Sequence, residues 1–221
     1  TSHIYTLSLD DALPIFEEDM GMKPMTDPAT LSEFVSYCKE NYPAGRNALV
    51  LWDHGGGSLY GFGSDEIFGG NSMQINEIDS ALEKAGVRFD FIGFDACLMA
   101  TVETACMVKR HADYMIGSEE VEPGTGWFYT GWIDRICENT SVPAREIGKV
   151  IADDFIRMCL EENPDGECTL SMIDLAEMDN VYNALCAFSA AAKEQLDSNN
   201  FKVIAHSVSN TKAFGDNLYD T

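Results

Sequence analysis

Two continuous apolar runs constrain the fold of this chain more than any other feature. They occupy residues 47–53 (NALVLWD) and 89–95 (FDFIGFD), and each ends in an aspartate. A strand without alternation of polar and apolar residues is typical of a parallel sheet that is covered on both faces. A glycine-rich stretch and one helical pattern separate the runs, so we expect neighbouring parallel strands joined by a right-handed crossover.

The rest of the chain alternates helix and strand patterns in the same way. Two further strands are expected at residues 113–118 and 169–174, and residues 55–70 are rich in glycine and are expected to form a long loop. Helices are expected at residues 27–41, 71–85, 98–112, 132–137, 142–160 and 175–196. This order predicts an α/β fold with a mostly parallel central sheet flanked by helices.

The chain has the length of one large domain, with a short leader before it. It has 221 residues and begins at Thr1. Residues 3–15 (HIYTLSLDDALPI) resemble translated sequencing-adapter sequence. We therefore expect residues 1–15 to be a non-native or disordered leader, and residues 16–221 to be one domain that is truncated at both ends.

The charge of the chain excludes some classes of function. Its 14 lysines and arginines against 37 aspartates and glutamates give a net charge of −23. Such a charge repels phosphate backbones, so no nucleic-acid partner is expected. No apolar run reaches the roughly 18 residues that a membrane-spanning helix needs. A cationic substrate or partner suits this charge.

The seven cysteines do not form a recognisable metal or redox motif. Their number is odd and no Cys-x-x-Cys occurs, which argues against a structural zinc site or a thioredoxin-like motif. Four of them follow apolar helical stripes and are expected to be buried as small apolar side chains: Cys38, Cys106, Cys159 and Cys186. Cys97 differs, because it follows the strand at 89–95.

Two reactive side chains follow the two apolar runs. His54 is the first residue after the run at 47–53, and Cys97 comes shortly after the run at 89–95. Ligands of parallel sheets bind beyond the carboxyl ends of the strands, so the imidazole and the thiol are expected to meet at one edge. Either residue alone is more often structural. Together they predict the arrangement that thiol nucleophilic catalysis needs.

The neighbouring residues favour this interpretation. A glycine at position 55 lets the backbone come close to a reacting carbonyl, and the amides of Gly55 and Cys97 are candidates for an oxyanion hole. A helix that begins near Leu98 is expected to lower the pKa of the Cys97 thiol.

Acidic residues and a tryptophan are candidates for substrate binding. Asp95 lies two residues before Cys97 and so points to the same side of an extended strand, where it could pair with a basic side chain. Alternatively, it is a structural aspartate that bonds loop amides. Glu119, Glu120 and Glu122 add negative potential to a cleft or belong to a solvated loop, and Trp127 is either a pocket wall or a core residue.

Three segments together resemble one known family. They are residues 52–57 (WDHGGG), residues 95–99 (DACLM) with Glu103, and residues 118–127 (SEEVEPGTGW). Over roughly residues 30–135 they are similar to the clostripain family of cysteine peptidases, which belongs to the caspase-like clan with gingipain and legumain. The resemblance implies a caspase-like three-layer sandwich over residues 16–221.

The resemblance also implies a function. It implies an endopeptidase that cleaves after arginine or lysine by a Cys-His dyad through an acyl-enzyme, with His54 as the catalytic histidine and Cys97 as the nucleophile. Asp95 is implied in the S1 subsite, and Glu122 and Trp127 are further candidates there. The partners are then proteins or peptides with a basic P1 residue, and the family suggests a secreted or cell-surface bacterial enzyme.

The proposed chemistry and the resemblance also bear on cofactors and on activation. No cofactor is required by this chemistry; calcium could bind the acidic surface, but no residues in the sequence fix a site. Relatives are activated by cleavage between the histidine and the cysteine, where this chain has only Lys84 and Arg88 as basic residues. Self-cleavage in the loop at 55–70 is therefore not expected.

Two other functions need motifs that the chain lacks, and two alternatives stay open. The HGGG segment at residues 54–57 also resembles the oxyanion motif of lipases and esterases, but these need a Gly-x-Ser-x-Gly elbow, which the chain lacks. Nucleotide binding lacks both Gly-x-Gly-x-x-Gly and a P-loop. A catalytically inactive peptidase-like domain that binds peptides or proteins, and the same dyad with another P1 preference, are the alternatives.

Overall fold

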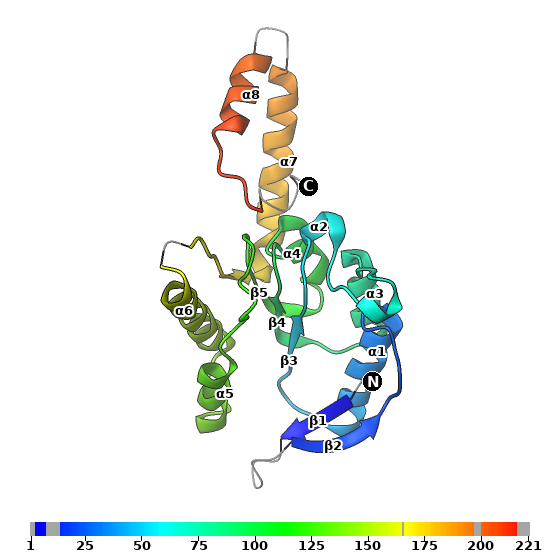
Figure 1. The fold of residues 1–221 in the computed structure, drawn as a ribbon. Helices are drawn as coiled ribbons and strands as arrows, with labels where there is room; N and C mark the ends of the chain where they lie inside the picture. Colours follow the sequence, from blue (N-terminus) through cyan, green and yellow to red (C-terminus); the bar gives the residue numbers. More distant parts are fainter. Residues whose placement is uncertain (1–2, 8–13, 165, 197–199, 216–221) are drawn as a thin grey trace.

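The computed structural model describes residues 3–7, 14–164, 166–196 and 200–215 (Figure 1). Its main sheet has the strand order β3-β4-β5-β6, formed by Ala48–Trp52, Phe89–Asp95, Ala112–Gly117 and Ser171–Asp174. The first three strands are parallel, and β6 is antiparallel to β5. The prediction of a mostly parallel α/β sheet is confirmed.

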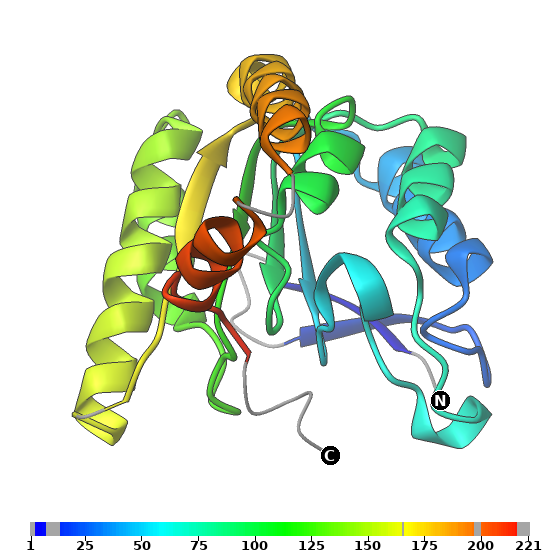
Figure 2. The same cartoon turned by 90° about the horizontal axis from the view of Figure 1, so that it is seen from above.

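Helices cover both faces of this sheet, which makes three layers (Figure 2). Helices α1 (Pro28–Asn41), α3 (Ile75–Ala85) and α4 (Val102–Val108) pack on one face. Helices α5 (Tyr129–Glu138) and α6 (Ala144–Glu162) pack on the other. The caspase-like sandwich expected from the sequence is this arrangement.

Strand β4 is buried on both faces, as its unbroken apolar pattern predicts. Ile92 and Phe94 belong to the core under α1, α3 and α4, whereas Phe91 belongs to the core under α5 and α6. Gly93 lies on the same face as Phe91, and the ring of Trp127 lies directly on it. The lack of a side chain at Gly93 therefore gives Trp127 its place in the second core.

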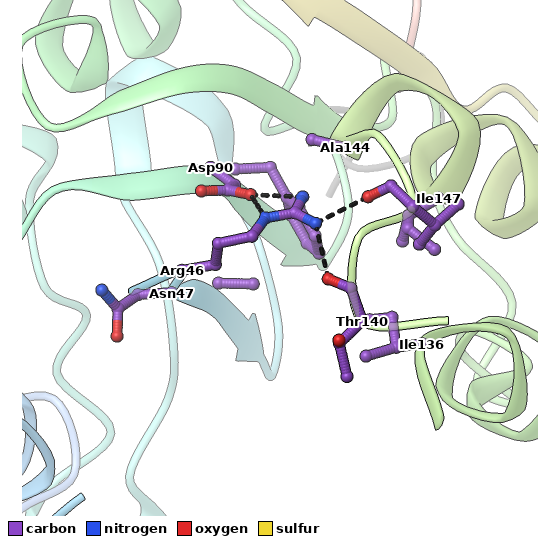
Figure 3. A pocket seen from close by; sticks show the side chains of 10 residues that line it. Arg46, Asn47, Asp90, Ile136, Thr140, Ala144 and Ile147 are labelled. Atoms are coloured by element: carbon purple, nitrogen blue, oxygen red, sulfur yellow. Dashed lines mark hydrogen bonds and ion pairs between the residues drawn. The ribbon is translucent and has the colours of Figure 1, made fainter. Parts of the chain in front are cut away.

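Arg46 links the central sheet to the layer of α5 and α6 at the amino ends of the strands (Figure 3). Arg46 precedes β3 and pairs with Asp90 of β4. One of its terminal nitrogens also donates to the carbonyl oxygens of Thr140, at 2.9 Å, and Val142, at 2.7 Å. These bonds hold the α5–α6 connection against the sheet. They lie at the edge opposite to the carboxyl ends of the strands.

Part of the expected leader at residues 1–15 forms strands. Strands β1 (His3–Leu7) and β2 (Pro14–Asp19) form a separate antiparallel pair. The expectation of a non-native or disordered leader over residues 1–15 stays a prediction, and residues 1–2 and 8–13 lie outside the described part of the chain.

The C-terminal helices extend away from the sheet. Helix α7 (Met178–Gln195) follows a 3-10 turn (Leu175–Glu177), and α8 (Phe201–Ser209) comes after it along the chain (Figure 1). Leu175 and Met178 are in the core, but the apolar residues farther along α7 are exposed. The expected burial of Cys186 is therefore wrong, because α7 continues beyond the layers that could cover it.

We predict that Gly93→Ala lowers the free energy of unfolding by about 1–3 kcal/mol, because a Cβ there overpacks the core. That atom would lie 2.7 Å from Cη2 of Trp127. Urea unfolding measures the change. Gly45→Ala is the control, since a Cβ at Gly45 has no atom within 4 Å; equal stability of the two variants would contradict the packing described here.

Candidate active site

The register of β3 and β4 brings the two predicted catalytic residues to one edge of the sheet. Trp52 lies opposite Asp95 at the carboxyl ends of these strands. The Asp53 N–H continues the ladder by donating to the Asp95 carbonyl oxygen at 3.4 Å. His54 follows Asp53 directly and Cys97 comes two residues after Asp95, so the sequence prediction that they share an edge is confirmed.

Gly55 lies against the backbone of Cys97. A Cβ at position 55 would be 2.1 Å from the Cys97 carbonyl oxygen and 3.0 Å from its nitrogen. No residue with a side chain fits at that separation, so glycine is required for this approach. The loop that carries His54 is thereby in contact with the residue that carries the thiol.

The backbone of His54 is held by its neighbours, while its side chain is exposed. Asp53 Oδ1 accepts from the His54 N–H at 2.5 Å and from the Ser64 N–H at 3.3 Å. The His54 carbonyl oxygen accepts from the Gly63 N–H at 2.8 Å. These bonds tie the glycine-rich loop back onto the end of β3.

The Cys97 thiol is half-buried among backbone amides. Its Sγ accepts from the Glu122 N–H at 3.3 Å. Burial raises the pKa of the Cys97 thiol above its ordinary value, and the amides of Glu122, Cys97 and Gly55 act in the opposite direction. The amides of Gly55 and Cys97 are thus near the sulfur, where the predicted oxyanion hole needs them.

The helix expected to begin at Leu98 begins four residues later, at Val102. Leu98 has a φ of 63°, a left-handed conformation that a leucine adopts only at an energetic cost. Thr101 caps α4, accepting from the Thr104 N–H at 3.1 Å. The expectation that a helix N-terminus lowers the pKa of the thiol is therefore wrong, because a turn separates Cys97 from α4.

The predicted S1 residues lie together and are almost fully buried. Asp95 is 2% exposed, and its Oδ2 accepts from the Trp127 N–H at 3.1 Å and the Tyr129 hydroxyl at 2.9 Å. Glu122 is 8% exposed. In the described part of the chain, its two carboxylate oxygens and Trp127 Nε1 have no hydrogen-bond partner.

The two carboxyl groups affect each other's charge. Burial and the like charge of Asp95 raise the pKa of Glu122 to about 9. Glu122 is therefore protonated at neutral pH, and Asp95 accepts its hydrogen bonds from Trp127 and Tyr129. We refer to Asp95 and Glu122 as the acid pair.

The other candidates have structural roles. Trp127 packs in the core, as one of its two alternatives predicted, and its N–H donates to Asp95, while its role as a pocket wall stays a prediction. Glu119 accepts from the Ser171 hydroxyl at 2.7 Å, and Glu120 from the Gly215 N–H at 3.0 Å. These two glutamates bind neighbouring segments rather than extending the acid pair.

Sequence reasoning missed two aromatic residues beside the acid pair. Tyr129 bonds Asp95, and its ring centroid lies 6.3 Å from that of Trp52, which is 68% exposed. The sequence did contain a signal for Trp52, because it lies near the end of the apolar run that precedes His54. It contained none for Tyr129.

The described residues include no cluster of three or more His, Cys, Asp or Glu side chains suited to a metal ion. Calcium binding stays an untested expectation. Among the described helices, none has the length and apolar character to cross a membrane.

Comparisons with known proteins agree with the geometry. A model of the clostripain family matches residues 3–220. Clostripain of Hathewaya histolytica is 32% identical over 140 residues, which are 55% of this chain and 25% of that protein. The chain is thus similar to a part of that relative.

Solved structures show the same fold. An inactive zymogen C11 protease from Parabacteroides distasonis is 29% identical, with a TM-score of 0.63 over 80% of this chain and 48% of that one. A secreted C11 cysteine protease from Bacteroides thetaiotaomicron, bound to an irreversible peptide inhibitor, has a TM-score of 0.69 at 24% identity, over 82% of this chain and 54% of that one. The chain spans about half the length of these solved relatives.

We predict that Glu122→Gln makes stability less dependent on pH. The folded-state pKa of Glu122, about 9, is above its ordinary value of 4.5. Its contribution is therefore fully present below about pH 4.5 and is lost as the pH rises toward 9. Between about pH 5 and pH 9, the wild type should lose on the order of a few kcal/mol more unfolding free energy than the variant.

Urea unfolding at both pH values measures this difference. Glu194→Gln, at an exposed position on α7, is the control and should follow the wild type. Parallel pH curves for wild type and Glu122→Gln would show that Glu122 is ionised in the folded protein.

Proposed function

The chain belongs to the clostripain family, and from this premise we propose that it is the catalytic part of a cysteine endopeptidase that cleaves after arginine or lysine. The observation that carries the proposal is the contact of Gly55 with Cys97, which joins the histidine loop to the thiol beside the acid pair. Its substrates are then proteins or peptides with a basic P1 residue.

Catalysis proceeds by acyl transfer in this proposal. The Cys97 sulfur attacks the scissile carbonyl carbon as its proton passes to His54, and the amides of Gly55 and Cys97 hold the resulting oxyanion. His54 then gives its proton to the leaving amine as the peptide bond breaks. A water molecule activated by His54 attacks the thioester, which releases the acid and returns the proton to the thiol.

Burial of the thiol determines when it ionises. Because its pKa is raised in the free protein, Cys97 rests as a thiol rather than as a thiolate. His54 is exposed, and the proton passes to its ring as the sulfur attacks the bound substrate.

The acid pair supplies the P1 preference. A guanidinium or ammonium group pairs with the Asp95 carboxylate, and the unpartnered Glu122 oxygens accept its remaining donors. Because both acids are buried, a covering side chain must move first. Tyr129 occupies an Asp95 oxygen, and the exposed Trp52 lies beside it, so we expect these two rings to shift when the P1 residue enters.

Secretion is part of the same proposal. The similar protease from Bacteroides thetaiotaomicron is described as secreted. We propose that this protein also acts outside the cell that makes it.

We predict that Cys97→Ala lowers kcat/KM by at least about 1,000-fold on fluorogenic peptides with P1 arginine or lysine, because the acyl-enzyme cannot form. An arginyl chloromethyl ketone should alkylate Cys97 in the wild type. Cys137→Ala is the control, because Cys137 is an exposed thiol on α5. Peptide binding without cleavage by the wild type would instead identify an inactive peptidase-like domain.

We predict that Asp95→Asn lowers kcat/KM for P1 arginine and lysine by about 100-fold, since the variant loses the charge that pairs with the cation. Peptides with a neutral P1 residue should be affected much less. Asp153→Asn, on the exposed surface of α6, is the control. Unchanged cleavage after basic residues would remove Asp95 from the S1 assignment.

A further inference from the structure

The turn at residues 118–122, which follows β5, lies next to the proposed nucleophile. Its backbone binds the turn that carries the thiol: the Leu98 N–H donates to the Glu120 carbonyl oxygen at 3.2 Å. The Ala100 N–H donates to the Ser118 carbonyl oxygen at 2.9 Å. Together with the bond from the Glu122 N–H to Cys97 Sγ, these contacts make the 118–122 turn the support of the nucleophile.

One hydroxyl, that of Thr169, holds the 118–122 turn in its conformation. Thr169 Oγ1 accepts from the N–H groups of Glu119, at 3.0 Å, and Glu120, at 3.1 Å. It lies 3.0 Å from the hydroxyl of Ser118, which is completely buried. Thr169 thus binds three consecutive residues of the turn.

The hydroxyls of Ser118 and Thr169 have a partner for every donor and acceptor position. Ser118 Oγ donates its proton to the Glu120 carbonyl oxygen at 2.8 Å, so Thr169 must donate to Ser118 Oγ. Both hydroxyls then use one donor and two acceptor positions, because the Glu120 N–H also donates to Ser118 Oγ at 3.0 Å. A fully satisfied network of this kind fixes one geometry.

The position of Thr169 follows from strand β6. Ser171 begins this strand and pairs with Gly117 in the antiparallel register. Thr169 lies two residues before Ser171, so it is carried past the end of β5 to the start of the turn. The Ser171 hydroxyl adds a bond to the Glu119 carboxylate on the same side.

We propose that Thr169 is a positioning residue of the site, which orients the proposed nucleophile Cys97 through the 118–122 turn. The inference rests on the proposed function and extends it to a residue outside the sequence motifs that carry the family resemblance. Thr169 contacts neither the sulfur nor the acid pair in the contacts described here, so its effect passes through the backbone of Glu120 and Glu122.

Valine and serine separate the hydroxyl from the shape of the side chain. Thr169→Val keeps the volume but removes the acceptor of the Glu119 N–H and one of the two acceptors of the Glu120 N–H. Thr169→Ser keeps the acceptor and the donor. If the hydroxyl positions the turn, activity is lost in Thr169→Val and restored in Thr169→Ser. If only the shape of the side chain matters, Thr169→Val keeps the activity.

The experiment measures peptide cleavage and thiol alkylation in the same set of variants. For Thr169→Val, kcat should fall about tenfold or more while KM changes less than about threefold, since the reacting atoms are misplaced rather than the substrate released. Thr169→Ser should stay within about threefold of the wild type in both. Thr140→Val, at an exposed threonine before α6, is the control and should match the wild type.

Alkylation by iodoacetamide tests the thiol without a substrate. The rate of modification of Cys97, divided by that of the exposed Cys137 in the same molecules, should fall about threefold or more in Thr169→Val, because the amide of Glu122 no longer supports the thiolate. If Thr169→Val does not fold, Ser118→Ala removes the other hydroxyl of the network and should give the same direction of change.

The outcomes distinguish the two proposals. A wild-type protein that cleaves no peptide overturns the proposed function, and the alkylation ratio still tests Thr169. An unchanged ratio and unchanged kcat in folded Thr169→Val, or a loss in Thr169→Ser as large as in Thr169→Val, overturns the role of the hydroxyl.

Discussion

The close approach of two backbones at the ends of β3 and β4 is the constraint on which the site depends. Parallel pairing places Trp52 opposite Asp95, and the next residues of both strands then leave the sheet side by side. Contact between them is allowed only because position 55 has no side chain. The thiol, the amides around it and the histidine loop all take their places from this contact.

The two cores of the sandwich have different relations to the site. The core under α1, α3 and α4 is made of aliphatic and aromatic side chains that fix the strands. The core under α5 and α6 reaches the acid pair through Trp127, which packs on Gly93 and bonds Asp95. In the proposed function, recognition and packing share residues on this side, so changes to that core are expected to affect specificity as well as stability.

The sequence was sufficient for features that depend on local pattern or on parallel topology. Unbroken apolar runs identified β3 and β4, and the crossover rule then placed His54 and Cys97 at one edge. It was insufficient where a distant segment decides the outcome. The left-handed turn at Leu98 is held by Ser118 and Glu120, and so the start of α4 was predicted too early. Tyr129 and Thr169 come from other parts of the chain, and no motif marks either of them.

If the acid pair binds a basic side chain as proposed, its affinity depends on the proton that the buried Glu122 retains at neutral pH. A cation bound between the two acids favours the ionised form of Glu122, so each binding event can expel a proton to solvent. Discrimination between a basic side chain and a neutral one of similar shape should then become stronger in alkaline surroundings than in acidic ones.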